Sequence, residues 1–208
     1  MQSVSSYVGR MTRHDLIVKA PATYQDVLDA PEDMVAEIVD GALSLQPRPA
    51  PRHTLAASGL GVEIGGPFYR GRGGPGGWWI LDEPELHFSP HVVVPDLAGW
   101  RRERMPELPE TAYFELAPDW VCEVLSPSTR THDQIAKRRI YEENRVEYLW
   151  FVDPDARTLQ AFRLTDQGLL LTGMVEGDEE VALPPFDAVP FGLGALWPPD
   201  PPEPEPET

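Results

Sequence analysis

Cysteine and lysine are both scarce in this chain of 208 residues. Its single cysteine, Cys122, excludes an internal disulfide framework and a zinc site built from several cysteines. Cys122 lies in the apolar run Trp120–Leu125, which favours a buried structural thiol over a nucleophile. Two of the 17 basic residues are lysines, Lys19 and Lys137, and the other 15 are arginines. Because arginine serves wherever plain positive charge suffices, a retained lysine indicates a need for a compact ammonium with a tunable pKa.

The chain also lacks long apolar runs and an excess of positive charge. No stretch approaches the roughly 18 apolar residues that a membrane helix needs, and the N-terminus lacks the features of a secretory signal. We therefore expect a cytoplasmic protein with no membrane partner. The 17 basic and 34 acidic side chains give a net charge of −17, the opposite of the balance usual in proteins that neutralise phosphates. This charge counts against avid, non-specific binding of DNA.

The length of the chain suits one globular domain. Residues 1–20 are polar and without clear periodicity, so we expect a flexible arm there. Residues 21–197 would form the domain. The acidic, proline-rich residues 198–208 predict a disordered tail.

Local patterns predict a mixture of helices and strands. Thr23, three residues before Asp26, predicts the cap of a short helix over Tyr24–Leu28. The Asp40-Gly41 pair between two β-rich runs predicts an antiparallel hairpin, because both turn positions need a positive φ.

Further along the chain, helices are expected over Arg52–Ile64 and from about His132 to Asn144, with a polar loop over residues 101–119. Strands are expected over Trp78–Leu81, Glu85–Phe88, His91–Leu97, Trp120–Leu125 and Val146–Val152. Short strands then form a C-terminal extension over Thr158–Leu164, Leu169–Val175 and Val181–Leu183. This order predicts an α/β or α+β domain with a mixed β-sheet flanked by helices.

Three acids stand inside apolar runs, where an unpaired charge is costly. Glu37 lies within Val35–Val39, and alternation places Glu123 on one face with Val121 and Leu125. In the same way, Asp96 shares a face with Val92 and Val94. One such acid is most often capped by backbone N–H groups or held in a structural ion pair.

Three embedded acids together favour a shared cation, because convergent carboxylates repel one another without one. Ligands that are all oxygen select Mg²⁺ or Mn²⁺ over zinc. The pattern therefore predicts a metal site formed by Asp96, Glu123 and Glu37, and metal-assisted attack on a phosphoester.

Lys137 belongs to a second pattern, on the helix that follows Glu123. Asp133, Lys137 and Tyr141 are spaced i, i+4 and i+8 and share one helical face. They form one polar and aromatic stripe, with Ala136 and Ile140 on an adjoining apolar edge. A surface lysine is the alternative.

These residues, in this order, resemble the PD-(D/E)xK nuclease superfamily and, more narrowly, its bacterial family of putative restriction endonucleases, over roughly residues 23–165. The matching pieces are Glu37–Leu43, His53, Val94–Asp96, Val121–Thr129, Asp133, Lys137, Tyr141 and Glu147–Pro154. The resemblance implies a restriction endonuclease-like core. The superfamily pattern places its lysine two positions after the second acid, where this chain has Leu125, so the resemblance transfers that role to Lys137.

The resemblance also implies a mechanism. Asp96 and Glu123, with a backbone carbonyl near Val124, would bind one Mg²⁺, and Glu37 would complete or orient the metal shell. Lys137 would orient the attacking water or stabilise the transition state, which leaves a 5′-phosphate and a 3′-hydroxyl. His53 would contact the phosphate or the residues around the metal, or else cap a helix or face solvent.

Three functions remain open on the sequence alone. The first is a Mg²⁺-dependent DNA endonuclease, expected to act as a homodimer so that two sites meet two strands. The second is a binding or regulatory module that keeps the nuclease fold without turnover, which the charge of −17 favours. The third, a glycosidase-type carboxylate pair, explains the acids but neither the lysine nor the ordered motif.

Overall fold

The computed structural model describes residues 17–127, 130 and 133–199. Its largest element is a six-stranded mixed sheet in which β8 and β9 are parallel and the other neighbours antiparallel. From one edge to the other the strands are β11 (Gly168–Glu176), β10 (Thr158–Thr165), β9 (Tyr148–Asp153), β8 (Trp120–Val124), β7 (Leu97–Arg101) and β4 (Trp78–Asp82). Strands β8 and β9 are buried along their whole length, as expected for strands covered on both faces.

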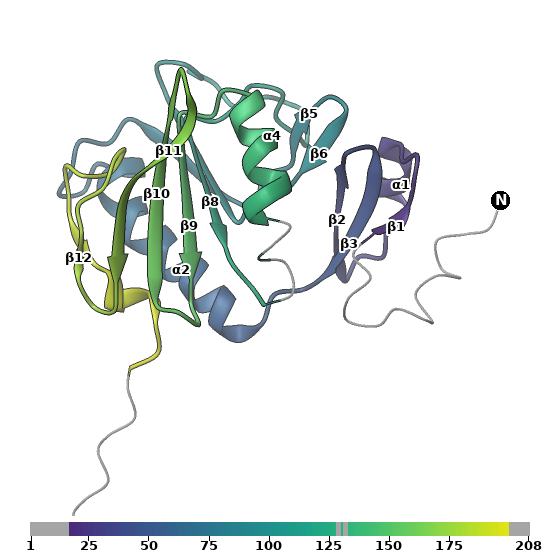
Figure 1. The fold of residues 1–208 in the computed structure, drawn as a ribbon. Coiled ribbons are helices and arrows are strands. Elements are labelled where there is room, and N and C mark those ends of the chain that lie inside the picture. Colours follow the sequence, from purple (N-terminus) through teal and green to yellow (C-terminus); the bar gives the residue numbers. More distant parts are fainter. Residues whose placement is uncertain (1–16, 128–129, 131–132, 200–208) are drawn as a thin grey trace, which may run out of the picture.

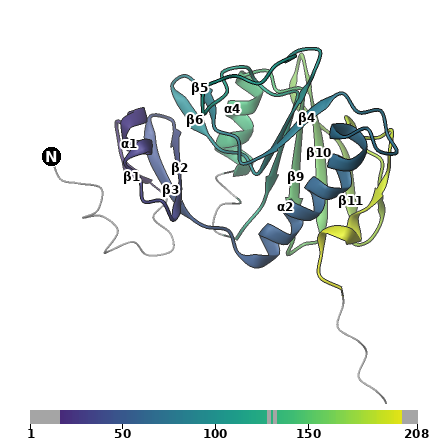
Figure 2. The same ribbon diagram turned by 180° about the vertical axis from the view of Figure 1, so that it is seen from behind.

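Helices cover both faces of this sheet, as Figures 1 and 2 show from opposite sides. The π-helix η4 (Asp133–Lys137) and helix α4 (Arg138–Glu143) connect the parallel strands β8 and β9 and pack on one face. Helix α2 (Pro51–Ile64) packs on the other face. Because side chains alternate along a strand, Val121 joins the core under α4 and Cys122 the core under α2.

A second sheet contains the predicted hairpin. Its order is β1 (Ile17–Lys19), β3 (Ala42–Pro47), β2 (Met34–Val39), β6 (His91–Val93) and β5 (Leu86–Phe88). Asp40 and Gly41 have φ values of 53° and 72°, which confirms the predicted turn. Helix α1 (Tyr24–Leu28) begins after Thr23, whose N–H donates to Asp26 Oδ2 at 2.8 Å, and confirms the predicted cap.

The structure corrects one expected strand. The run His91–Leu97 is not a single strand, because β6 and β7 belong to different sheets and residues 94–96 connect them. Pro95 has no N–H to donate and so interrupts a strand ladder. Asp96 therefore lies in the connection between the two sheets rather than within an apolar strand.

The ends of the domain also differ in detail from the expectation. Residues 17–19 of the expected arm pair with β3 as β1, because a strand edge offers unpaired backbone groups. Residues 1–16 of that arm and residues 200–208 of the expected tail lie outside the described residues. The C-terminal extension adds β10 and β11, of eight and nine residues, to the main sheet. Short elements follow: β12 (Glu180–Val181), β13 (Phe191–Gly192) and the 3-10 helix η5 (Leu193–Leu196).

One more helical element is the π-helix η3 (Gly65–Tyr69), which continues α2. Across the described ranges, no helix is both long and apolar enough to span a bilayer.

Candidate active site

Asp96 and Glu123 lie beside each other where β7 and β8 meet. Leu97 pairs with Cys122, so the antiparallel register places Asp96, one residue before β7, next to Glu123. The N–H of Val124 donates to Asp96 Oδ2 at 2.7 Å, which fixes one oxygen of this carboxylate. The structure thus brings the two predicted acids to one end of the sheet.

Lys137 and Tyr141 reach Glu123 from the helical face above it. Lys137 ends η4 and Tyr141 lies one turn later in α4, so both point the same way. Lys137 Nζ lies 3.2 Å from each carboxylate oxygen of Glu123. The hydroxyl of Tyr141 donates to Glu123 Oε1. Leu125, at the position where the superfamily has lysine, is instead buried in the core under α4.

Glu37 approaches the same ammonium from the hairpin. Its Oε1 lies 2.9 Å from Lys137 Nζ and accepts the N–H of Val94 at 2.7 Å. Its Oε2 accepts a hydrogen bond from Gln46 Nε2 at 2.9 Å. Lys137 therefore lies between two carboxylates that come from different sheets.

His53 contacts Asp96 from the opposite face of the main sheet. It lies in the first turn of α2, and its Nε2 is 3.2 Å from Asp96 Oδ1. The side chains of His53 and Asp96 are 13% and 16% exposed, so His53 neither faces solvent nor occupies the cap, which is Ala50. Of the two interpretations of His53, the structure places it in the surroundings of the carboxylates.

Asp133 begins η4, and its side chain lies outside what the structure describes. Its supporting role stays a prediction.

Cys122 is buried on the face opposite Glu123. Burial, with further contributions from the charges of Asp96 and Glu123, raises the pKa of its thiol well above the usual range. A thiol held in its neutral form is a poor nucleophile. The electrostatics of the site therefore agree with a structural role for Cys122.

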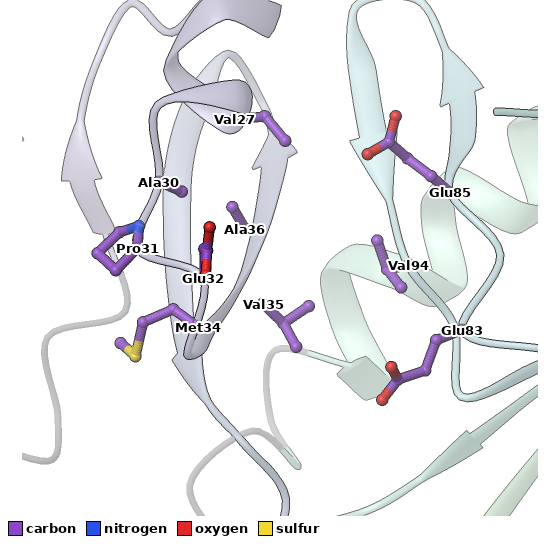
Figure 3. Close-up of a pocket in the computed structure, with 10 residues that line it drawn as sticks. All are labelled: Val27, Ala30, Pro31, Glu32, Met34, Val35, Ala36, Glu83, Glu85 and Val94. Carbon is purple, nitrogen blue, oxygen red and sulfur yellow. The ribbon is translucent and has the colours of Figure 1, made fainter. Parts of the chain in front are cut away.

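A pocket lies close to this cluster but is separate from it. It has a volume of ≈ 270 Å³ and runs between β2 and the segment that carries Glu83 and Glu85 (Figure 3). Val94 lines the pocket, whereas its backbone binds Glu37 and Lys137. Because Glu32, Glu83 and Glu85 also line it, the pocket is a poor place for a phosphate.

Sequence reasoning missed Gln46 and the backbone of Val94. The two-residue turn fixes the hairpin register, in which Val35 pairs with Gln46 and Glu37 with Ser44. Gln46 is therefore the diagonal neighbour of Glu37 on one face of the sheet, a contact that the predicted turn already implies. The role of Val94 depends on the crossing between two sheets and has no sequence signal.

The family model for Uma2, described as putative restriction endonuclease, matches residues 21–193. The chain belongs to this family. A solved structure described as a putative nuclease belonging to DUF820, from Anabaena variabilis ATCC 29413, has a TM-score of 0.68 and 22% sequence identity. That match covers 85% of this chain and 97% of the other, and at this identity it shows a shared fold. No curated protein matches the chain.

Membership of a nuclease family raises the question of whether the residues fit a divalent metal. Within the described ranges, no group of three Asp, Glu, His or Cys side chains could hold an ion by itself. Mg²⁺, however, is commonly bound by one or two carboxylates together with waters and the phosphates of a substrate. Asp96 and Glu123 supply such a pair of hard oxygen ligands at the end of the sheet. The donor set fits Mg²⁺ or Mn²⁺ in the presence of a phosphate.

Proposed function

We propose that this protein is a Mg²⁺- or Mn²⁺-dependent endonuclease that hydrolyses phosphodiester bonds in DNA. The observation that carries the proposal is the meeting of Asp96, Glu123 and Lys137, from three separate elements, at one end of the main sheet. Family membership supports nuclease chemistry for this site.

In this proposal, Asp96 and Glu123 hold the metal, with the Val124 carbonyl beside them. When bound, the cation would lower the pKa of a water molecule and offset charge on the scissile phosphate. His53, 3.2 Å from Asp96, orients that carboxylate, and the hydroxyl of Tyr141 orients Glu123.

Lys137 provides the third function. An ammonium has three donors and no lone pair, so it acts by donating hydrogen bonds and not by accepting a proton. Its donors already meet Glu37, Glu123 and the Val94 carbonyl. To orient the attacking water it would exchange its longest contact, 3.3 Å to that carbonyl, and through its charge it can stabilise negative charge that develops on the phosphate. Its burial at 3% exposure strengthens such an interaction because little water competes.

A second candidate function is a binding or regulatory module without turnover. The net charge of −17 favours it. The pairing of arginines with acids in the segments that flank the site favours it as well. These pairs are Arg48–Glu83, Arg130–Asp153 and Arg139–Asp40. Such pairing leaves less positive charge for a phosphate backbone. The homodimer and the cytoplasmic location stay predictions.

Cleavage assays separate the two functions. The purified full chain is incubated with supercoiled and linear DNA in Mg²⁺ or Mn²⁺, beside Asp96→Asn and Lys137→Met. Asp155→Asn, at an exposed aspartate in the turn between β9 and β10, is the matched control.

We expect the wild-type protein and Asp155→Asn to cleave DNA only with metal, and the other two variants to be inactive. Equal cleavage by all four proteins would identify a contaminating nuclease and contradict the proposal. If the wild-type protein binds Mn²⁺ through Asp96 but cleaves neither DNA, the module without turnover is correct.

A further inference from the structure

Glu37 is the most buried acid of the cluster, with 0% of its surface exposed. A buried carboxylate needs opposite charge and hydrogen bonds to compensate for its lost hydration. Glu37 has both, since Lys137 and the Val94 N–H meet Oε1 and Gln46 meets Oε2. Protein groups thus occupy both of its oxygens. Glu123 is also buried, at 2% exposure, but the strand register places it beside Asp96, whose side chain is 16% exposed, whereas Glu37 comes from the other sheet.

The position of the Lys137 ammonium depends on Glu37. The ammonium lies 2.9 Å from Glu37 Oε1 and 3.2 Å from both oxygens of Glu123, and it donates to the Val94 carbonyl at 3.3 Å. Two carboxylates on different sides hold it between them. If Glu37 were neutral, Coulomb attraction would pull the ammonium toward Glu123 alone.

Glu37 also holds the segment that carries Asp96. The N–H of Val94 donates to Glu37, while its carbonyl accepts from Lys137. Val94 is two residues from Asp96, and Pro95 between them restricts the backbone. Glu37 is therefore linked both to the Lys137 ammonium and to the segment that carries Asp96.

We infer that Glu37 is a positioning residue, fixed by Gln46, that sets the place of the Lys137 ammonium and of the Val94–Asp96 segment. It is not a ligand of the metal. The inference rests on the proposed function for its catalytic consequence, but the contacts themselves can be tested without any substrate.

The scarcity of lysine gives a direct test. In the full-length protein labelled with ¹³C and ¹⁵N in lysine alone, NMR reports two side chains, Lys19 and Lys137. Lys19, with a side chain that is 49% exposed, is the internal reference, and Lys19→Arg assigns its signals by removing them. We expect Glu37→Gln to shift the signals of Lys137 and leave those of Lys19 in place.

The matched control is Glu176→Gln, at an exposed glutamate on β11. It should move neither lysine. Gln46→Ala should shift Lys137 in the same direction as Glu37→Gln by a smaller amount, and it supplies the test if Glu37→Gln fails to fold. An unchanged Lys137 signal in the folded Glu37 variant, or in Gln46→Ala if that variant must replace it, would overturn the inference.

Metal binding separates the positioning role from a ligand role. By calorimetry with Mn²⁺, Glu37→Gln should lower the affinity by no more than about 10-fold, as expected for a residue that positions the segment carrying a ligand, whereas Asp96→Asn should lose binding. In cleavage assays, Glu37→Gln should lower kcat by about 10- to 100-fold, as for residues that orient catalytic groups, with KM for DNA unchanged. A loss of Mn²⁺ affinity in Glu37→Gln as large as that in Asp96→Asn would make Glu37 a ligand. If the wild-type protein bound no Mn²⁺, the proposed function would fail while the NMR result still decided the position of Lys137.

Discussion

The two sides of the site differ in exposure and in what their carboxylates contact. On the hairpin side, Glu37 is 0% exposed and bound to Lys137, Gln46 and Val94. On the α2 side, Asp96 is 16% exposed and contacts His53, which is 13% exposed. The hairpin side is suited to hold an ammonium in a fixed place. The α2 side retains access to solvent, from which a metal and a phosphate can arrive.

The difference follows from the elements that carry the two acids. Glu37 stands in the middle of β2, with strands β3 and β6 on either side. Asp96 stands in the connection between β6 and β7, beside the end of β8. A residue at the end of a sheet can face a ligand without disturbing the ladder, whereas one inside a sheet needs partners from its neighbours.

The largest effect on cleavage should come from a change on the α2 side. Asp96→Asn removes a charged metal ligand yet keeps an oxygen that can accept the Val124 N–H. A metal contributes several kcal/mol of charge stabilisation, so we expect cleavage to fall by about 10³-fold while the unfolding temperature changes little. Initial rates on supercoiled DNA give the measurement, with Asp155→Asn as the control. Wild-type rates in Asp96→Asn would show that Asp96 is not needed for cleavage and would contradict its role as a metal ligand.

On the hairpin side, the main effect should be on stability. Lys137→Met leaves Glu37 buried without its cation, and breaking a buried ion pair costs about 3–5 kcal/mol. Urea denaturation measures the loss. The double variant Glu37→Gln, Lys137→Met should be more stable than Lys137→Met alone, because it removes the uncompensated charge. A double variant no more stable than the single one would show that Glu37 and Lys137 are not coupled.

Tyr141→Phe tests the orientation of Glu123, which lies beside Asp96 and contacts Lys137. The hydroxyl of Tyr141 donates to Glu123, which also contacts Lys137. Without it, Glu123 keeps its charge but is less well oriented, and we expect about a 10-fold loss of Mn²⁺ affinity. Calorimetry on the folded variant checks this value. Wild-type affinity would mean that Tyr141 serves packing only.

The smallest effect lies outside both sides, at the start of α1. Hydrogen bonds from Lys19 and Thr23 lower the pKa of Asp26 from 3.8 to about 2. A lowered pKa in the folded protein gives stability that is present above pH 3.8 and lost as the pH falls toward 2. Asp26→Asn should weaken this acid dependence of the unfolding temperature and leave DNA cleavage unchanged. An identical pH profile in variant and wild type would contradict the contribution of Asp26.

Much of the local structure could be predicted from the sequence. The Asp40-Gly41 turn, the cap at Thr23 and the buried strand around Glu123 rely on local preferences, which the structure retains. The run His91–Leu97 could not be assigned in the same way. An apolar run has the same pattern whether it stays in one sheet or crosses to another, so the place of Asp96 depended on tertiary packing.

The partners of the Lys137 ammonium also depended in part on tertiary packing. Helical spacing placed Lys137 and Tyr141 on one face, and the structure brings both to Glu123. The contact between Lys137 and Glu37 joins residues 100 positions apart. No local pattern encodes such a pairing. The metal site of three acids stays a prediction, and the positioning role that we infer for Glu37 is an alternative to it.

The most direct measurement is anomalous diffraction from crystals of the full chain soaked in Mn²⁺. We expect one strong peak within bonding distance of both Asp96 and Glu123, with Glu37 still bound to Lys137. A peak bonded to Glu37, or crystals that take up Mn²⁺ without contact to Asp96 and Glu123, would contradict the proposed site.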